Sequence, residues 1–353
     1  MSIVTIVGAG MMGTALCWPL SDNGHEVRLV GTHLDEEFIR EIRASRVHPK
    51  MRRTVPERVI PYSYTEIPAA VSGADVVVCA VSSFGVEWFA EHVGAYMTSE
   101  VPVLSVTKGL KDTPQGDLWV IPEYLNRLLP AEKQGKISLN AVGGPVISHE
   151  LAGRRHTGTV YCGTDPEILK RLQSIFATHY YHVVISSDVI GVEVCAALKN
   201  GFALSVNLPL GEYERDGADG LAHMFNPQAA LFAQSMLEMQ RLIQLLGGSQ
   251  NDLVVLAGAG DLYVTVFGGR TARLGRLLGK GTRYSEARQI LAGETLESVE
   301  IIATVCRALP LLEARGLAKV DDFPLIRSLN TIIQQETDPE LPWDLFFQNN
   351  LRN

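Results

Sequence analysis

The sequence predicts an α/β N-terminal domain with a doubly wound sheet, followed by an all-α C-terminal domain. Three observations support this fold class. The chain has 353 residues, which is enough for two domains with cores of their own. Short β-branched runs alternate with helical stretches up to residue 187, as in a parallel sheet covered by helices on both faces. Beyond residue 187 apolar residues recur at helical spacing. We therefore expect domains at residues 1–187 and 188–353.

The composition restricts the classes of partner. Hydrophobic residues make up 46% of the chain and charged residues 20%, which excludes extensive disorder. The net charge of -8 argues against nucleic acid as a partner, and a small anionic ligand would need a local cationic pocket. The five cysteines show no metal-ligand or disulfide spacing. Continuous apolar runs are far below the ~18 residues that span a bilayer, and the N-terminus does not resemble a signal peptide. We expect a cytoplasmic protein without membrane insertion.

Individual elements follow from local composition. Strands are predicted where β-branched and apolar residues fill short runs, at residues 3–7, 26–30, 75–81, 101–106 and 137–142. Helices are predicted at residues 188–210, 226–246, 249–256, 272–278, 285–291, 296–315 and 324–334. Residues 211–226, rich in glycine and acids, are predicted to form an exposed excursion. The tail from Thr337 is predicted to be a loosely attached helix.

The first predicted strand is followed at once by Gly8-Ala9-Gly10-Met11-Met12-Gly13, which opens a helix. In this spacing the first glycine makes a tight turn, the second lets backbone approach a pyrophosphate, and the third lets helix and strand pack closely. A second strand completes a βαβ unit. The segment therefore predicts a dinucleotide site in a Rossmann-type domain, with a purely structural glycine turn as the alternative.

The end of the second strand bears on which dinucleotide is bound. An acid at this point binds the ribose 2′-hydroxyl and repels a 2′-phosphate. Here the strand is followed by Gly31-Thr32-His33, with no acid before Asp35. Seven basic residues lie between residues 40 and 58; they could hold a 2′-phosphate, and a solvated helix face followed by a basic loop explains them equally well. We expect NADP, or both NADP and NAD, as the cofactor.

Two lysines occupy positions that are unfavourable for a cation. Lys199 is the only cation of residues 188–210, whose apolar residues cover nearly the whole helix surface. Such a helix is buried, and a buried lysine that has lost part of its proton affinity can act as a general acid or base. The alternative is a side chain that extends to the surface. Lys108 and Gly144 follow two predicted strands, where open α/β sheets bind ligands; a surface lysine and an ordinary turn are the alternatives.

Residues 258–270 combine four glycines with Asp261 and Arg270. We interpret this segment as a loop that approaches a ligand, in which Asp261 orients a lysine and Arg270 forms paired hydrogen bonds to a phosphate or carboxylate. A glycine-rich connector between helices, required for steric reasons only, is the alternative.

The order of these motifs resembles that of the soluble NAD(P)-dependent glycerol-3-phosphate dehydrogenase family, over residues 1–316. The motifs are GAGMMG near the N-terminus, VTKGL around Lys108, GGPVISHE around Gly144, AALKNGFALS around Lys199, GAGDLYVT around Asp261 and GGRTARLGRLLGKG around Arg270. The resemblance implies interconversion of dihydroxyacetone phosphate and sn-glycerol 3-phosphate by hydride transfer. It also implies a homodimer and no metal ion.

The resemblance further implies roles for individual residues. Lys199 would be the general acid/base, with Lys108 and Asp261 as further catalytic residues. The substrate-binding residues would be Lys108, Gly144, Asn200, Asp261, Thr265, Arg270 and Thr271. The cofactor-binding residues would be Gly8, Gly10, Met11, Met12, Gly13, Thr32, His33, Lys108, Ser148, Arg270 and Glu297.

The chain departs from the family pattern at several positions. Thr271 replaces the usual asparagine, Val146 a common serine, and Ser298 the glycine after the family's glutamate; His48-Pro49-Lys50-Met51 replaces H-P-x-L-G. Two of these changes fall at substrate-contact positions, so a related polyol or ketose phosphate is an alternative substrate. A ketopantoate-reductase-like or opine-dehydrogenase-like enzyme and a non-catalytic nucleotide-binding protein are further alternatives. The intact lysines and Asp261 argue against the last.

Overall fold

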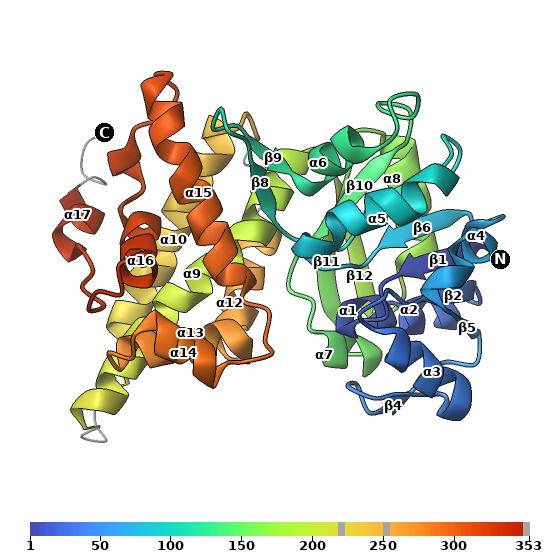
Figure 1. Cartoon of the computed structure of the whole chain (residues 1–353), viewed down its shortest axis with the longest axis horizontal. Helices are drawn as coiled ribbons and strands as arrows, with labels where there is room; N and C mark the ends of the chain where they lie inside the picture. Colours follow the sequence, from blue (N-terminus) through green and yellow to red (C-terminus); the bar gives the residue numbers. More distant parts are fainter. Residues whose placement is uncertain (218–222, 250–254, 349–353) are drawn as a thin grey trace. The chain divides into compact units, whose positions relative to one another are not determined.

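The structure, a computed structural model, describes residues 1–217, 223–249 and 255–348. The chain forms two compact units (Figure 1), the first from Met1–Lys108 and Val120–Glu193, the second from Gly109–Trp119 and Val194–Asn353. It therefore passes between the units after Lys108, after Trp119 and after Glu193. The boundary expected after residue 187 lies shortly before the last of these points.

An eight-stranded sheet forms the centre of the first unit, in the order β12-β11-β10-β7-β6-β1-β2-β5. The strands are β1 (Ile3–Val7), β2 (Glu26–Val30), β5 (Val59–Tyr62), β6 (Val76–Cys79), β7 (Val103–Ser105), β10 (Leu139–Gly143), β11 (Thr157–Cys162) and β12 (Tyr181–Ser186). Neighbouring strands are parallel except β10 and β11. The doubly wound fold is confirmed, but a wholly parallel sheet is wrong. The β10–β11 connection holds only the five-residue helix α7 (Ser148–Ala152), too short to return the chain along the full strand.

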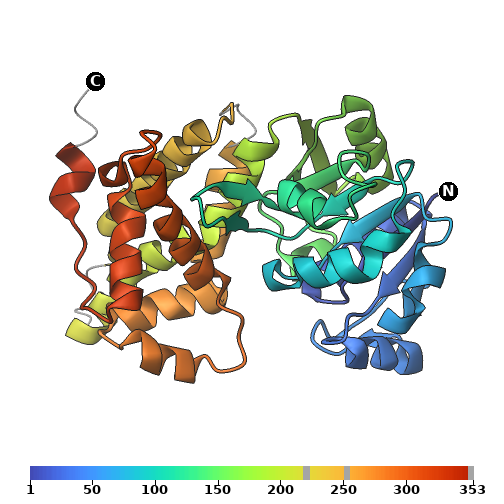
Figure 2. The ribbon, with the colours of Figure 1, turned by 45° about the horizontal axis from the view of Figure 1, so that its top comes forward.

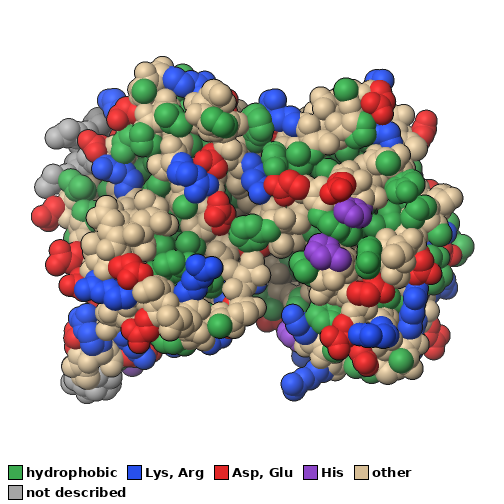
Figure 3. All heavy atoms as spheres, in the orientation of Figure 1, with side chains coloured by type: hydrophobic (Ala, Val, Ile, Leu, Met, Phe, Trp, Pro, Cys, Tyr) green, Lys and Arg blue, Asp and Glu red, His purple; other side chains and the backbone are tan. Residues whose placement is uncertain are grey.

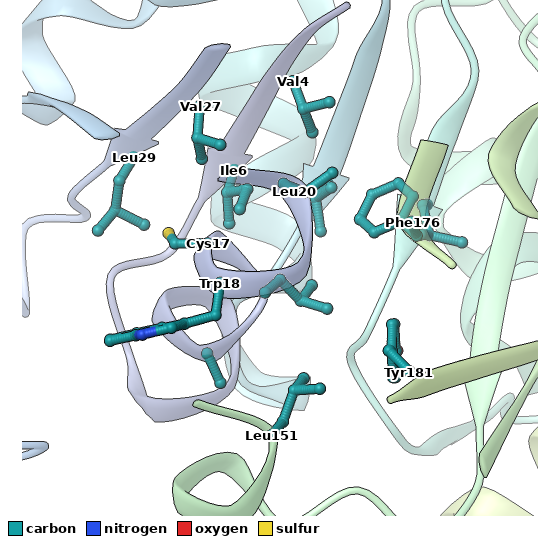
Figure 4. Close-up of a cluster of buried hydrophobic side chains, with 14 of the residues drawn as sticks. Val4, Ile6, Cys17, Trp18, Leu20, Val27, Leu29, Leu151, Phe176 and Tyr181 are labelled. Atoms are coloured by element: carbon teal, nitrogen blue, oxygen red, sulfur yellow. The ribbon is translucent and has the colours of Figure 1, made fainter. Parts of the chain in front are cut away.

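Helices cover both faces of this sheet and enclose two hydrophobic clusters. One cluster includes α1 (Met11–Ala15), α2 (Cys17–Asp22), α3 (Glu36–Ser45), α7 and α8 (Pro166–Phe176); the other includes α4 (Ile67–Val71), α5 (Val86–Val93) and α6 (Ile121–Leu128). In Figure 4, side chains of α2 lie over β1 and β2 in the first cluster. Val76 and Val78 of β6 belong to this cluster, whereas Val77 and Cys79 belong to the other. This alternation is the reason that β6 is apolar throughout.

The second unit is helical (Figure 2). Its helices are α9 (Val189–Asp216), α10 (Phe225–Leu245), α12 (Asp261–Val266), α13 (Gly269–Gly279), α14 (Tyr284–Ile290), α15 (Glu297–Ala314), α16 (Pro324–Gln334) and α17 (Trp343–Gln348). The predicted all-α domain is confirmed. The predicted excursion at residues 211–226 is wrong at its ends, because α9 continues to Asp216 and α10 begins at Phe225. Residues 218–222, and residues 250–254 of the helix predicted at 249–256, lie outside the described part.

The glycine-rich residues 258–270 are helical except for Phe267 and Gly268, which corrects the prediction of a loop. The helical residues belong to a π-helical turn (Leu256–Gly260), α12 and the start of α13. Close packing accounts for one of these glycines: a Cβ on Gly258 would lie 2.9 Å from the Cys195 Sγ atom of α9. The steric alternative therefore holds for Gly258, and α12 is placed directly against α9.

Helix α9 is long and apolar enough to cross a membrane by length and composition alone, contrary to the expectation from continuous apolar runs. Within its most apolar window, however, 78% of the residues are buried inside the structure, as in the core helix of a globular domain.

A hairpin of β8 (Leu110–Asp112) and β9 (Leu118–Val120) contacts α15 through the ion pairs Arg307–Asp112, 2.8 Å, and Arg315–Asp117, 2.7 Å.

Candidate active site

The three glycines of the turn after β1 differ in the space around them. Gly8 has a φ of 116°, and a Cβ there would lie 2.4 Å from the Ala80 carbonyl oxygen. A Cβ on Gly13 would lie 2.2 Å from the Gly8 carbonyl oxygen, so these two glycines are needed for packing. A Cβ on Gly10 would have no atom within 4 Å, and Met11 and Met12 are only partly buried. The open backbone at Gly10 fits the approach of a dinucleotide pyrophosphate.

His48 is fully buried and anchors this turn. It lies in the short β3 strand (Val47–His48), which pairs with β4 (Arg53–Thr54). The Met51 N–H donates to His48 Nδ1 over 3.0 Å, so Nε2 carries the proton and donates to the Ala9 carbonyl oxygen over 2.8 Å. Burial lowers the pKa of His48, which favours the neutral ring that this arrangement requires. The H-P motif therefore has a structural purpose next to the glycine turn.

The carboxyl group of Asp35 lies beside the end of β2. Thr32 donates to Asp35 Oδ1 from its backbone N–H and, over 2.9 Å, from its hydroxyl group. Burial raises the pKa of Asp35. His33 is exposed, and its ring lies 5.6 Å from that of Trp88. In space, therefore, a carboxyl group stands beside the end of the strand, although in sequence Asp35 follows it by several residues.

Four of the seven basic residues between residues 40 and 58 have partners within the first unit. Arg43 pairs with Glu66, and Arg46 and Arg53 donate to backbone carbonyl oxygens. Lys50 lies 5.1 Å from the centre of the Phe38 ring. These contacts favour the interpretation as a structured surface over a dedicated 2′-phosphate site. On the face shown in Figure 3, basic and acidic side chains are interspersed in the same way.

Lys108 follows β7 and lies near the turn after β10. Its Nζ atom donates to the Gly144 carbonyl oxygen over a long 3.4 Å. Gly144 has a φ of 136°, and a Cβ there would lie 3.1 Å from the Thr159 Cα atom, so glycine is required at this position. Thr107 fixes the strand end by donating to the Val81 carbonyl oxygen over 2.7 Å. The first unit thus brings Lys108 and Gly144 together as expected from parallel strand ends. Ser148 begins the short helix α7.

Lys199 and Asp261 form a buried ion pair in the second unit. Lys199 Nζ lies 2.5 Å from Asp261 Oδ1 and 3.2 Å from Thr265 Oγ1. The side chain of Lys199 is 12% exposed and that of Asp261 is 1% exposed. Asp261 begins α12, and Thr265 lies one turn later and donates to the Asp261 carbonyl oxygen over 2.6 Å. Because three groups from α9 and α12 converge, the lysine is held as an ammonium group with one small exposed face. Asn200 follows it on α9, half-buried.

Arg270 lies in the first turn of α13 and pairs with Glu297, the first residue of α15, over 2.5 Å. The two side chains are 40% and 20% exposed, so the pair remains open to solvent. Thr271 beside it is buried, as is Ser298, whose hydroxyl group has no hydrogen-bond partner among the described residues. Val146 packs against the core of the first unit. The pairing of Arg270 with Glu297 could not be predicted from the sequence, because the two residues are 27 positions apart.

Glu193 is a buried residue that the sequence interpretation missed. It is the only acid among the apolar residues 189–211 of α9, as Lys199 is the only cation. The reasoning that identified Lys199 would therefore have identified Glu193. Burial raises its pKa to about 8, against the charge of Lys108, which lowers it.

A Rossmann-type unit with this glycine turn, joined to a helical unit that buries a lysine–aspartate pair, defines a two-domain, dinucleotide-dependent dehydrogenase. Comparison with known families agrees. Residues 3–169 match the model of the NAD-dependent glycerol-3-phosphate dehydrogenase N-terminus, and residues 188–343 match that of its C-terminus. The chain belongs to the NAD-dependent glycerol-3-phosphate dehydrogenase family.

Individual relatives support the assignment. The NADP(+)-dependent glycerol-3-phosphate dehydrogenase of Archaeoglobus fulgidus is 34% identical, over 87% of this chain and 88% of the relative. The glycerol-3-phosphate dehydrogenase [NAD(P)+] of Lysinibacillus sphaericus is 31% identical, over 98% and 95%. The crystal structure of the glycerol-3-phosphate dehydrogenase of Coxiella burnetii has a TM-score of 0.78 and 25% identity, and covers 100% of this chain and 99% of its own. A PanE/ApbA family ketopantoate reductase from Ralstonia eutropha shares the fold at a lower TM-score of 0.57, with 20% identity over 95% and 99%.

Proposed function

We propose that the protein interconverts dihydroxyacetone phosphate and sn-glycerol 3-phosphate with NADP, or with both NADP and NAD, as a cytoplasmic homodimer. The observation that carries this proposal is the buried pair of Lys199 and Asp261 in a unit that also presents Arg270. Reduction of a ketone is faster when a positioned side chain can donate a proton to the carbonyl oxygen. The printed names of the relatives in Archaeoglobus fulgidus and Lysinibacillus sphaericus support the substrate and both cofactors.

In the direction of reduction, a reduced nicotinamide dinucleotide held at the turn of Gly8, Gly10 and Gly13 would supply the hydride that the carbonyl carbon receives. The Lys199 ammonium group donates its proton to the carbonyl oxygen, so that C=O gains one hydride and one proton and becomes CH–OH. Asp261 and Thr265 hold the Lys199 ammonium group in place for this proton transfer. Lys108, with Gly144, binds substrate beside the strand ends, and Asn200 adds an amide next to Lys199.

Arg270 is proposed to bind the substrate phosphate. Thr271, the next residue, is proposed to contact the substrate as well. Its present partner is Glu297, which is also a proposed cofactor contact. A phosphate dianion presents three oxygens to the guanidinium group and can replace a single carboxylate. The Arg270–Glu297 pair therefore keeps the arginine oriented until the anion binds.

The cofactor is proposed to lie along the turn at Gly8, Gly10, Met11, Met12 and Gly13, near Thr32 and His33, with Lys108, Ser148, Arg270 and Glu297 as further contacts. The position of Asp35 at the end of β2 suits a free ribose 2′-hydroxyl, whereas the printed names of the relatives in Archaeoglobus fulgidus and Lysinibacillus sphaericus support use of NADP. The two together favour use of both dinucleotides.

The experiment is a matrix of NADPH or NADH with dihydroxyacetone phosphate, longer ketose phosphates and ketopantoate, followed by loss of absorbance of the reduced cofactor. We expect the highest kcat/KM with dihydroxyacetone phosphate and measurable rates with both cofactors. Activity on ketopantoate alone, or on no phosphorylated ketone, would refute the proposal. Sedimentation of the purified protein tests the homodimer separately.

A further inference from the structure

Asn207 of α9 is a buried polar residue to which the proposed reaction gives no role. Its amide Nδ2 atom donates to the Ala203 carbonyl oxygen of the same helix over 2.9 Å and to the Val266 carbonyl oxygen of α12 over 3.2 Å. Both partners are acceptors, so the amide nitrogen must face them. The Oδ1 atom has no hydrogen-bond partner among the residues that the structure describes. A buried unpaired acceptor costs free energy, so stability alone does not explain an asparagine here.

The hydrogen bond to Val266 is made at the end of α12. Val266 is the last residue of this helix and follows Thr265 directly. The last carbonyl groups of a helix have no partner within it, and the backbone is already extended at Gly268. Val266 is half-buried, so water could otherwise reach its carbonyl group. The Asn207 amide therefore fastens the end of α12 to α9, one residue beyond the hydroxyl group that contacts Lys199.

Asn207 belongs to a row of α9 residues spaced by multiples of four, which forms a ridge along a helix. This ridge meets the segment of α12 at three points, which are Cys195 at Gly258, Lys199 at Asp261 and Thr265, and Asn207 at Val266. The contacts of the proposed proton donor thus lie between two points at which the segment is attached to α9.

Helix α13 limits the freedom of the Asn207 side chain. A Cβ on Gly275 of α13 would lie 2.8 Å from the Asn207 Cβ atom and 2.4 Å from the Leu204 carbonyl oxygen, so α13 packs directly against this part of α9. A side chain in such close packing has few alternative rotamers. The amide of Asn207 therefore stays directed at Val266.

We propose that Asn207 is a positioning residue for Thr265: its amide holds the end of α12 and thereby keeps the Thr265 hydroxyl group at the Lys199 ammonium group. The inference rests on the proposed function for the role of Lys199. Without this donor, the Val266 carbonyl group binds water and the last turn of α12 opens more often. In the opened state Thr265 Oγ1 leaves its place 3.2 Å from Lys199 Nζ, and proton transfer loses its geometry.

The test compares Asn207→Leu with the wild type and with the matched control Ser205→Ala. Leucine has about the size of asparagine and no polar side-chain atom. Ser205 is also buried on α9, but its hydroxyl group donates within the helix, to the Phe202 carbonyl oxygen over 2.7 Å. The measurements are kcat and KM for dihydroxyacetone phosphate and the dissociation constant of NADPH. We expect kcat of Asn207→Leu to be at least about threefold lower, with both binding values within about twofold of wild type. Ser205→Ala should match the wild type throughout.

A double-mutant cycle separates positioning from a general loss of folded protein. Asn207→Leu is added to Thr265→Val, in which the hydroxyl group to be positioned is already absent. We expect a further fall in kcat of less than about 1.5-fold in this background. A merely structural asparagine would lower kcat by the same factor in both backgrounds, and this result, or an unchanged kcat of Asn207→Leu alone, overturns the proposal.

A second readout does not depend on catalysis. Backbone hydrogen exchange is followed by mass spectrometry in a peptide that covers α12, with a peptide from α15 as the internal reference. We expect the α12 peptide to exchange at least about threefold faster in Asn207→Leu, and the α15 peptide and Ser205→Ala to be unchanged. Equal exchange of α12 in variant and wild type overturns the proposal. If exchange changes but dihydroxyacetone phosphate is not reduced, the proposed function fails and the attachment of α12 by Asn207 stands. Asn207→Ala replaces the leucine variant if that variant does not fold, with the same expected directions.

Discussion

Lys199 of α9 donates hydrogen bonds to Asp261 and Thr265 of α12, and the Lys199–Asp261 pair is almost completely buried. This relationship requires the close contact of two helices, because Gly258 just before α12 lies against Cys195 one turn before Lys199. The Asp261 carboxylate and the Thr265 hydroxyl group fix the position of the Lys199 ammonium group. The pair is therefore the expected centre of the proton-transfer step.

Replacement of Lys199 by alanine should abolish turnover, because the proton donor is lost. We expect kcat to fall by at least about 10³-fold, while the dissociation constant of NADPH changes by only a few fold. Thr265→Val is the matched comparison: it removes one hydrogen bond to Lys199 and keeps the ion pair, so the loss should be on the order of tenfold. Turnover retained by Lys199→Ala would remove this residue from the mechanism.

Replacement of Arg270 by alanine should raise KM for a phosphorylated substrate by about 10²-fold, because a charge-assisted, paired contact is lost. The control is Arg273→Ala on the same helix, whose exposed side chain pairs with Glu294. That variant should behave as wild type. If Arg270→Ala raised KM for a non-phosphorylated ketone by the same factor, the residue would not be the phosphate ligand.

His48→Ala should weaken cofactor binding by about tenfold, because the Ala9 carbonyl oxygen in the glycine turn loses its donor. The KM for dihydroxyacetone phosphate should change little. The control is His182→Ala, an exposed ring stacked on His156. Equal NADPH dissociation constants for His48→Ala and wild type would contradict the anchoring role.

The same residue predicts a pH dependence of stability. Burial lowers the pKa of His48 in the folded state, so the unfolded chain binds the proton more readily. Its contribution is therefore present above about pH 6.5 and is lost as the pH falls. Urea unfolding between about pH 7 and about pH 5 should show a smaller loss of free energy in His48→Ala than in wild type.

Glu238 predicts the opposite dependence. Burial raises its pKa to about 7, although Gln234 and two backbone N–H groups lower it, so the folded state binds the proton more readily. Stability from this group is complete below about pH 4.5 and is lost as the pH rises through the folded value. Between about pH 5 and about pH 8, wild type should lose on the order of 3 kcal/mol of unfolding free energy that Glu238→Gln keeps. Parallel pH curves for the two proteins would contradict this assignment.

The sequence predicted those parts of the site that depend on local pattern. The glycine turn follows from residues adjacent in the chain, and the buried Lys199 follows from the apolar surroundings within its own helix. The helical state of residues 258–266 did not follow, because Gly258, which looked like a loop signal, serves a contact with α9 more than 60 residues earlier. Likewise, Asp35 reaches the end of β2 only through a turn stabilised by Thr32. Such relationships depend on tertiary contacts, which no spacing rule contains.

The central claim is that this chain reduces a ketone recognised by its phosphate group. The most direct measurement is the initial rate of NADPH oxidation with dihydroxyacetone phosphate and with dihydroxyacetone, which share the reacting carbonyl group and differ only in the phosphate. We expect kcat/KM to be at least about 10³-fold higher for the phosphorylated ketone, because Arg270 and Lys108 supply charge only to an anion. Equal values for the two ketones, or no oxidation with either, would contradict the account.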